Sequence, residues 1–247
     1  TNPSSGRFCN GTPLTFANAI TTGAPYPTRI NASGLAGTLA KVTLELNGLS
    51  HQFPDDMDMM LTGPNGNSLV AFSDAGGGAA VSGVTLFLDS TAASALPDST
   101  TLTSGTFRPA DYEAGTDTFQ SPAPATNRFS ASTTSLGTAF NNSNPNGLWT
   151  LWTRNDGAGA QGGGSLAGGW CVNLTDDRPS VPEMPTTTER RCGWLEAHAA
   201  SIATLEWAGE CLREMLDCER RLRRILDRAD TGWYAGVCGN EIGREYL

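Results

Sequence analysis

The sequence has little charge, little histidine and no long apolar run. Charged residues account for 17% of its 247 residues, and histidine occurs only twice. No apolar segment reaches the roughly 20 residues that a membrane-spanning helix needs, so we expect no membrane span. The formal net charge of −9 argues against nucleic acid as a partner, because the phosphate backbone would be repelled.

The common motifs of nucleophilic catalysis are also missing. The stretch GGGSLAGG lacks the Gly-x-Ser-x-Gly spacing of a nucleophile elbow. His51 and His198 fall in different halves of the chain, which argues against a Ser-His-Asp triad. The glycine-rich run around GGGSLAGG has no lysine after a glycine, so it does not match a phosphate-binding loop. We therefore expect no catalytic residues in this chain.

Glycine and proline are abundant instead, with 29 and 14 residues. In residues 1–177, short apolar runs are separated by turns rich in glycine and asparagine. In LAKVTLELNGL, for example, Val42, Leu44 and Leu46 alternate with polar residues, as in a half-buried strand. Many short strands with such turns predict a mainly β domain over residues 1–177, a β-sandwich or jelly roll of a secreted protein.

The chain after residue 177 has a different character. Pro179, Pro182 and Pro185 recur at every third position, which predicts an extended linker over residues 178–187. Residues 188–247 are predicted to form an α-helical tail, because apolar side chains recur there at helical spacing. The apolar stripe contains Leu205, Leu212, Met215, Leu222 and Leu226. A stripe this broad needs a partner, so we expect the tail to bind another copy of the chain or another extracellular protein.

The stretch HQFPDDMDMMLTGPNG, residues 51–66, concentrates acidic residues around a predicted strand. Its aspartates can brace backbone amides, hold a calcium ion or act in catalysis, and the sequence leaves these alternatives open. In the calcium interpretation, the ligands are Asp55, Asp56, Asp58 and Asp74, with loop carbonyls. The sequence calls for no other cofactor. His51 is either a ligand or base, or a hydrogen-bonded residue at the surface or edge of the strand.

Two motifs resemble the P domain of subtilisin-like proprotein convertases, in the form found as modules of bacterial secreted and surface proteins. They are LNGLSHQFPDDMDMMLTGPNGNSLVAFSDAGGG and, downstream, NPNGLWTLWTRNDGAGAQGGGSLAGGWCVNL. The resemblance covers about residues 8–175. It implies a jelly-roll β-sandwich without catalytic residues, which in convertases packs beside a protease and stabilises it.

The resemblance also implies that the segments with Trp149 and Trp170 form adjacent strands. If Trp149 and Leu151 face inward, then Trp152 faces outward. Two interpretations of Trp152 stay open. It is either an exposed surface that binds a sugar or a partner, or a side chain packed on a neighbouring strand of a half-covered sheet.

Cysteine placement predicts disulfides and an oxidising compartment. Cys9 lies in the first strand region and Cys171 in the last, and the first and last strands of such sandwiches often neighbour each other. We therefore predict a Cys9–Cys171 disulfide, which would stabilise the fold by roughly 4–5 kcal/mol in the chain-entropy model. The protein is accordingly expected to be secreted or displayed at the cell surface.

The tail carries the remaining cysteines. Cys211 and Cys218 would lie about 10 Å apart along a helix, too far for a disulfide. Cys218 is predicted to pair with Cys238 across a turn. Cys192 and Cys211 are then left for disulfides between chains, with free thiols as the alternative.

Asn-x-Ser/Thr triplets mark acceptor sites for glycans if the host glycosylates the protein. The asparagines are Asn10, Asn31, Asn141 and Asn173.

Three functional hypotheses follow from the sequence. The first is a non-catalytic secreted or cell-surface module that acts by binding, adhesion or assembly through its helical tail. The second is an accessory domain released from a larger subtilisin-like serine protease. The third is a structural subunit of an extracellular filament or coat.

Overall fold

The computed structural model describes residues 5–115, 117–157 and 163–177. These residues fold almost entirely into β-strands, with the helix α1 (Leu136–Phe140) and the 3-10 turn η1 (Pro54–Asp56). The prediction of a mainly β domain is confirmed. The predicted linker and helical tail, residues 178–247, lie outside the described residues. Within the described ranges, no helix has the length and apolar character that crossing a membrane requires.

The first sheet has seven strands, and its central path runs in the order β1-β14-β5-β13-β2. Strand β8 pairs with the other edge of β5, and β9 pairs with β8. The strands are β1 (Ser5–Asn10), β2 (Leu14–Phe16), β5 (Leu39–His51), β8 (Val81–Leu88), β9 (Gly105–Phe107), β13 (Gly164–Leu166) and β14 (Trp170–Asp176).

The second sheet also has seven strands, in the order β10-β7-β6-β12-β3, with β11 beside β7 and β4 beside β12. The strands are β3 (Thr21–Thr22), β4 (Thr28–Ala32), β6 (Met57–Thr62), β7 (Ser68–Ser73), β10 (Ala110–Asp111), β11 (Arg128–Ser130) and β12 (Gly147–Asn155).

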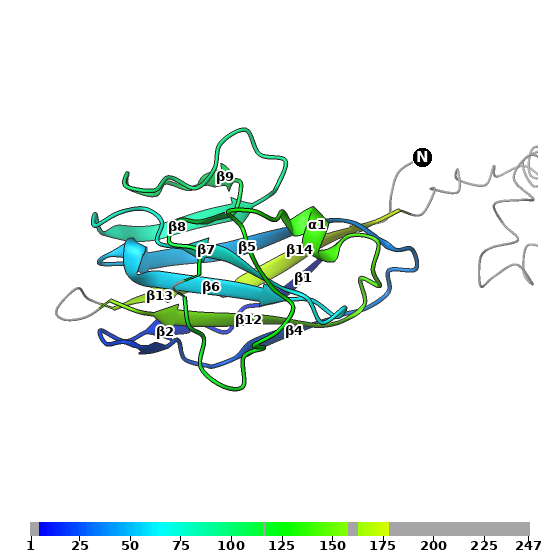
Figure 1. The fold of residues 1–247 in the computed structure, drawn as a ribbon, viewed down its shortest axis with the longest axis horizontal. Helices are drawn as coiled ribbons and strands as arrows, with labels where there is room; N and C mark the ends of the chain where they lie inside the picture. Colours follow the sequence, from blue (N-terminus) through cyan, green and yellow to red (C-terminus); the bar gives the residue numbers. More distant parts are fainter. Residues whose placement is uncertain (1–4, 116, 158–162, 178–247) are drawn as a thin grey trace, which may run out of the picture. The chain divides into compact units, whose positions relative to one another are not determined.

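The two sheets pack face to face as a β-sandwich, with β6, β7 and β12 in front of β5 and β14 in Figure 1. Side chains alternate along each strand, so every second residue points into the layer between the sheets. Leu44 and Leu46 of β5 share one buried core with Met57 and Met59 of β6. The alternation predicted for Val42, Leu44 and Leu46 is confirmed, because all three face this core.

Trp149 and Trp170 are fully buried in this core, but their strands are not adjacent. Trp149 lies on β12 in the second sheet, and Trp170 lies on β14 in the first. The expectation of neighbouring strands was therefore wrong. The two segments pack across the sandwich, because each contributes one face to the shared core.

The outer face of the second sheet is covered as well. Met60, Val70 and Trp152 form a second buried cluster, against which Tyr26 and Phe119 pack. Trp152 is only 5% exposed, and its indole Nε1 donates to Thr62 Oγ1 at 2.9 Å. The interpretation of Trp152 as an exposed binding surface is therefore wrong. The chain between β10 and β11 crosses this face and removes the indole from solvent.

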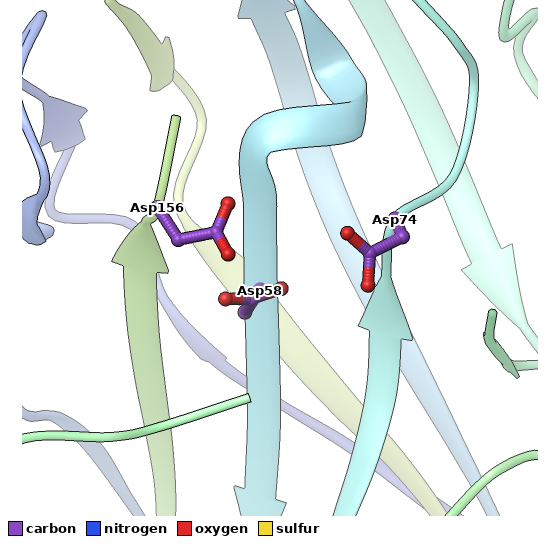
Figure 2. A group of neighbouring side chains, drawn as sticks. All are labelled: Asp58, Asp74 and Asp156. Carbon is purple, nitrogen blue, oxygen red and sulfur yellow. The ribbon is translucent and has the colours of Figure 1, made fainter. Parts of the chain in front are cut away.

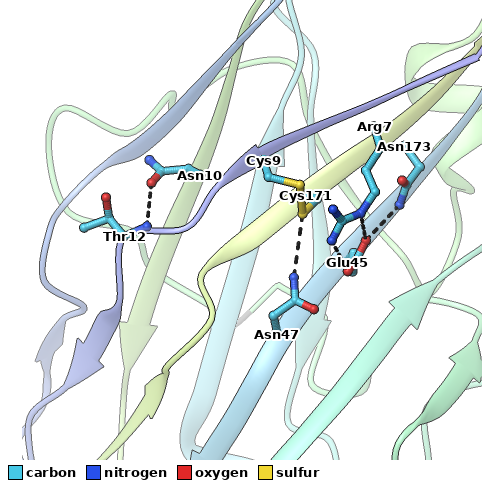
Figure 3. Close-up of a disulfide and its surroundings, with 8 residues drawn as sticks. All are labelled: Arg7, Cys9, Asn10, Thr12, Glu45, Asn47, Cys171 and Asn173. Carbon is cyan, nitrogen blue, oxygen red and sulfur yellow. Dashed lines mark hydrogen bonds and ion pairs between the residues drawn. A yellow bond between two sulfur atoms is a disulfide. The ribbon is translucent and has the colours of Figure 1, made fainter.

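The Cys9–Cys171 disulfide joins the first and last described strands (Figure 3). Strands β1 and β14 are antiparallel, and their register places Cys9 directly opposite Cys171. The two Cα atoms lie 4.1 Å apart across a sequence separation of 162 residues. The predicted pairing is confirmed, whereas the four tail cysteines lie outside the described residues.

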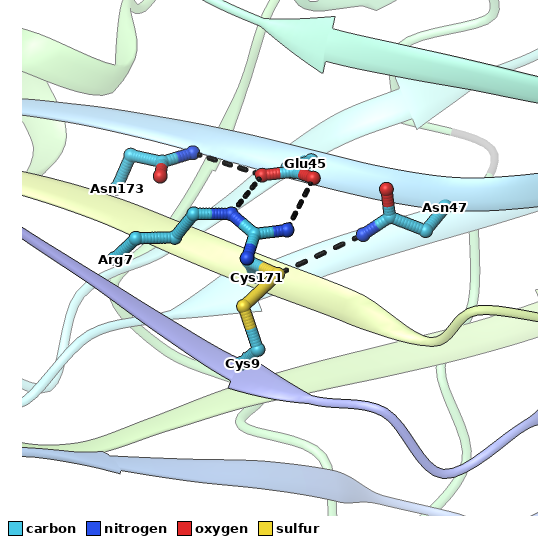
Figure 4. Close-up of polar contacts among 6 residues, drawn as sticks. All are labelled: Arg7, Cys9, Glu45, Asn47, Cys171 and Asn173. Carbon is cyan, nitrogen blue, oxygen red and sulfur yellow. Dashed lines mark hydrogen bonds and ion pairs between the residues drawn. A yellow bond between two sulfur atoms is a disulfide. The ribbon is translucent and has the colours of Figure 1, made fainter.

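A polar network surrounds the disulfide on the outer face of the first sheet (Figure 4). The Arg7 guanidinium donates to both carboxylate oxygens of Glu45, at 2.9 and 2.8 Å. Asn173 Nδ2 donates to Glu45 Oε2 at 3.3 Å, and Asn47 Nδ2 donates to the Cys171 sulfur at 3.7 Å. The hydrogen bond from Arg7 is the main reason that the pKa of Glu45 is lowered.

Three of the four predicted glycan acceptors use their amide nitrogen inside the fold. Asn10 Nδ2 donates to Thr28 Oγ1 and to a backbone carbonyl, both at 3.0 Å. Asn141 Nδ2 donates to a backbone carbonyl of β5 at 2.6 Å, and Asn173 Nδ2 donates to Glu45. A glycan on any of these nitrogens would crowd its partner in the fold, whereas Asn31 on β4 is exposed and is the acceptor that the folded structure suits best.

Candidate functional site

Neighbouring strands of the second sheet place acidic residues at one common end. Asp58 is the second residue of β6, Asp74 follows β7, Asp156 follows β12, and Asp111 is the last residue of β10. Strand β6 runs antiparallel to β7 and β12, and β10 runs parallel to β7. The beginning of β6 therefore lies beside the ends of the other strands.

Asp58, Asp74 and Asp156 form a compact group of carboxylates. Each offers one oxygen, and these oxygens all lie within 4.8 Å of one another. Figure 2 shows the carboxylates of Asp74 and Asp156 approaching Asp58 from opposite sides. Calcium binds oxygen at about 2.3–2.6 Å, so two of its ligands lie at most about 5 Å apart. The spacing fits a single divalent cation.

Asp58 is the most deeply buried member of the group. Its side chain is 0% exposed, and its Oδ2 has no hydrogen-bond partner among the described residues. Burial, together with the charges of Asp117 and Asp156, raises the pKa of Asp58 to about 9. An unpaired carboxylate oxygen in the protein interior is costly unless a proton or a cation compensates it.

Ser73 joins this group to Asp117. Its Oγ lies 2.9 Å from Asp58 Oδ1, 2.8 Å from Asp74 Oδ2 and 2.9 Å from Asp117 Oδ1. A serine hydroxyl has one proton to donate, so at most one of these carboxylates receives it. The other carboxylates must either carry protons of their own, which they donate to Ser73, or be neutralised by a cation. A cation bound at these carboxylates would therefore displace protons from them.

Asp56 and Asp117 also have weakened acidity. Burial raises the pKa of each to about 6, with the charge of Asp156 as the next cause for Asp56. Arg128 and Arg154 lie near the cluster, but their guanidinium groups donate to other groups than these carboxylates. The Arg128 guanidinium donates to the backbone carbonyl of Asp117 at 2.6 Å, and the Arg154 guanidinium donates to Thr118.

Local backbone features bring η1 against the end of β12. The backbone N–H of Asp156 donates to the carbonyl of Asp56 at 2.9 Å. A Cβ atom at Gly157 would overlap the Asp56 carboxylate, so a larger residue there would push this side chain aside. Asp74 adopts a left-handed conformation with φ of 49°, which turns the chain sharply after β7.

Only some of the ligands predicted from the sequence lie in the acidic group. Asp58 and Asp74 belong to the cation-sized group, and Asp56 lies beside Asp156. Asp55 does not contribute an oxygen to that group. Sequence reasoning missed Asp156, although an aspartate followed by glycine at the end of a predicted strand was a usable signal.

His51 does not take part in the acidic group. It is only 1% exposed, which corrects the expectation of a surface residue. Its Nδ1 lies 2.7 Å from the carbonyl oxygen of Phe53 and 3.1 Å from the backbone nitrogen of Phe53, and its ring packs edge-on against Phe16. Burial lowers the pKa of His51 from 6.5, so the ring is neutral at pH 7.

The set of ligands is made of oxygen alone. Carboxylates suit hard cations such as calcium, whereas zinc and copper sites usually include histidine or cysteine. Comparison with known protein families and with curated proteins finds no match for this chain. The resemblance to P domains therefore rests on the two sequence motifs.

Proposed function

We propose that the sandwich is a calcium-stabilised, non-catalytic binding module of a secreted or cell-surface protein. The observation that carries this proposal is the group of Asp58, Asp74 and Asp156, with its buried and unpartnered Asp58 oxygen. A calcium ion there would tie the beginning of β6 to the ends of β7 and β12. It would also replace the protons that these carboxylates otherwise need.

Calcium suits the group better than magnesium does. Magnesium needs near-ideal octahedral geometry at about 2.0–2.1 Å and keeps several of its waters. Here the carboxylates come from three different strands, and Asp58 is fully buried. Calcium tolerates such irregular, largely dehydrated coordination because its ligand number and distances vary more widely.

A structural role is favoured over acid–base catalysis. A catalytic acid or base must reach the reacting group of its substrate. The Asp58 carboxyl is 0% exposed and bonds to Ser73 inside the protein, so a substrate cannot reach it. Its raised pKa follows from burial and from neighbouring charges, which a cation would offset.

The disulfide supports an extracellular setting for this module. Disulfides persist in oxidising compartments, and extracellular calcium sites bind with dissociation constants of about 10⁻⁴–10⁻³ M. In line with the P-domain resemblance, we propose a jelly-roll topology and a role beside another domain or protein. Association through residues 188–247 remains a prediction from their apolar stripe, because those residues lie outside the described part.

The proposal is tested by melting the full-length protein with calcium and with a chelator. At a calcium concentration of about 100 times Kd, binding adds about 2.7 kcal/mol to the free energy of unfolding. For a chain of this size, this corresponds to a rise in Tm of roughly 5–10 °C. The variant D58N, which lacks this site, should show a smaller rise than the wild-type protein.

The matched control is D89N. Asp89 forms an ion pair with Lys41 at 2.7 Å beside the first sheet, away from the acidic group. This variant should keep the full response to calcium. An unchanged Tm of the wild-type protein with calcium and with chelator would contradict the proposed function.

A further inference from the structure

We propose that the same end of the sandwich holds a second divalent cation, bound between Asp111 and Asp117. This inference rests on the proposed calcium site at Asp58, Asp74 and Asp156. The two ions would share the carboxylates around Ser73 and form a pair of neighbouring sites.

The first argument is the state of the Asp111 and Asp117 side chains. They are only 4% and 6% exposed. Asp111 Oδ1 and Asp117 Oδ2 have no hydrogen-bond partner among the described residues. The two carboxyls lie close enough to hydrogen-bond to each other, and Asp111 also approaches Ser130. Both unpartnered oxygens therefore belong to one buried acidic pair, which needs a proton or a cation.

The second argument is the spacing of the strands. Asp111 ends β10 and pairs in register with Ser73 of β7, whereas Asp156 follows β12. The strand order β10-β7-β6-β12 separates β10 from β12 by three strand spacings, or about 14 Å. The two aspartate side chains together shorten this gap by only about 7 Å, so their oxygens stay about 7 Å apart. The ligands of one calcium ion lie at most about 5 Å apart. One ion therefore cannot bind both Asp111 and Asp156.

The third argument is charge. The acidic end collects the carboxylates of Asp56, Asp58, Asp74, Asp111, Asp117 and Asp156. Within the described ranges none of them forms an ion pair, because the ion pairs there join Arg7 to Glu45 and Lys41 to Asp89. Asp58, Asp111 and Asp117 are buried, and a single divalent ion at Asp58 would leave the Asp111 and Asp117 pair without a counter-charge.

The second ion would also hold in place the segment between β10 and β11 that covers Trp152. Asp117 lies between β10 and β11, just before Phe119, which packs on the outer cluster. Binding through Asp117 would fix this covering segment to the end of β7, through Ser73 and Asp111.

The test is native mass spectrometry of the full-length protein in calcium, after exchange into a volatile buffer. We expect two calcium ions per wild-type chain. The variants D111N and D117N should each keep one ion, and D156N should lose the ion at the first site and keep the other. D89N, the surface control, should keep two. Circular dichroism of each variant would establish that the β-sandwich is retained.

The possible outcomes separate the two proposals. One ion per wild-type chain would overturn the second site and leave the proposed function standing. No bound ion would overturn both. Loss of both ions from D111N and D117N, with the fold retained, would show one indivisible site and also contradict the inference. Two ions in the wild-type chain, with one ion left in D111N and in D117N, would support the second site.

Discussion

In the presence of a chelator, the full-length protein should lose about 2 kcal/mol of unfolding free energy as the pH rises from about 7 to about 9. The cause is Asp58, whose pKa is raised to about 9 by burial and by the charges of Asp117 and Asp156. The measurement is urea unfolding, followed by tryptophan fluorescence, at several pH values in this window.

The sign follows from proton binding. In the unfolded chain Asp58 loses its proton near pH 3.8, whereas in the folded protein it keeps the proton up to about pH 9. Stability from this group is complete below the unfolded pKa and is lost as the pH rises through the folded pKa. With saturating calcium the folded carboxylate is already ionised, so stability should hardly change with pH across the same window.

Asp56 and Asp117, whose pKa values are raised to about 6, release their protons mostly below this window, and comparison with the matched variant accounts for the other buried carboxyls. Burial lowers the pKa of His51 from 6.5, so its effect falls below pH 7, and burial raises the pKa of Tyr26 to about 12. The matched variant is D58N, which cannot ionise. Its unfolding free energy should not show this fall between pH 7 and pH 9. Equal slopes for wild-type protein with calcium and with chelator would contradict the coupling.

Replacing both members of the disulfide, in the variant C9S/C171S, should lower the unfolding free energy by about 5 kcal/mol. The disulfide closes a loop with a sequence separation of 162 residues, so its loss releases much chain entropy in the unfolded state. Urea unfolding of the variant and of the wild-type protein under non-reducing conditions measures the difference.

The tail cysteines need their own control. A variant with Cys192, Cys211, Cys218 and Cys238 replaced by serine retains Cys9 and Cys171 alone. Adding reductant to this variant should reproduce the loss seen in C9S/C171S. A loss below about 1 kcal/mol in both experiments would show that the disulfide contributes little.

Local patterns predicted the strands correctly and named two members of the acidic group. The alternation in β5 and β6 fixes which residues face the core, because side chains alternate strictly along a strand. Asp58 and Asp74 were identified because they adjoin strand ends in one continuous stretch. The Cys9–Cys171 pairing followed from the expectation that the first and last strands neighbour each other, which the β1–β14 register confirms.

The rest depends on contacts between distant segments. Asp156 and Asp117 reach the acidic end from β12 and from the chain after β10, nearly 100 and 60 residues from Asp58 along the sequence. The periodicity of apolar residues along one segment does not indicate which strands become its neighbours. Trp152 was assigned to an outer face correctly, but the segment that buries it, which includes Phe119, carries no periodic signal.

The central claim is that calcium binds at Asp58, and anomalous X-ray diffraction from crystals grown in calcium tests it most directly. The account predicts an anomalous peak within about 2.3–2.6 Å of carboxylate oxygens of Asp58, Asp74 and Asp156. Crystals of D58N grown in the same way should lack this peak. A wild-type map without a peak at these carboxylates, at a calcium concentration of several millimolar or more, would contradict the account.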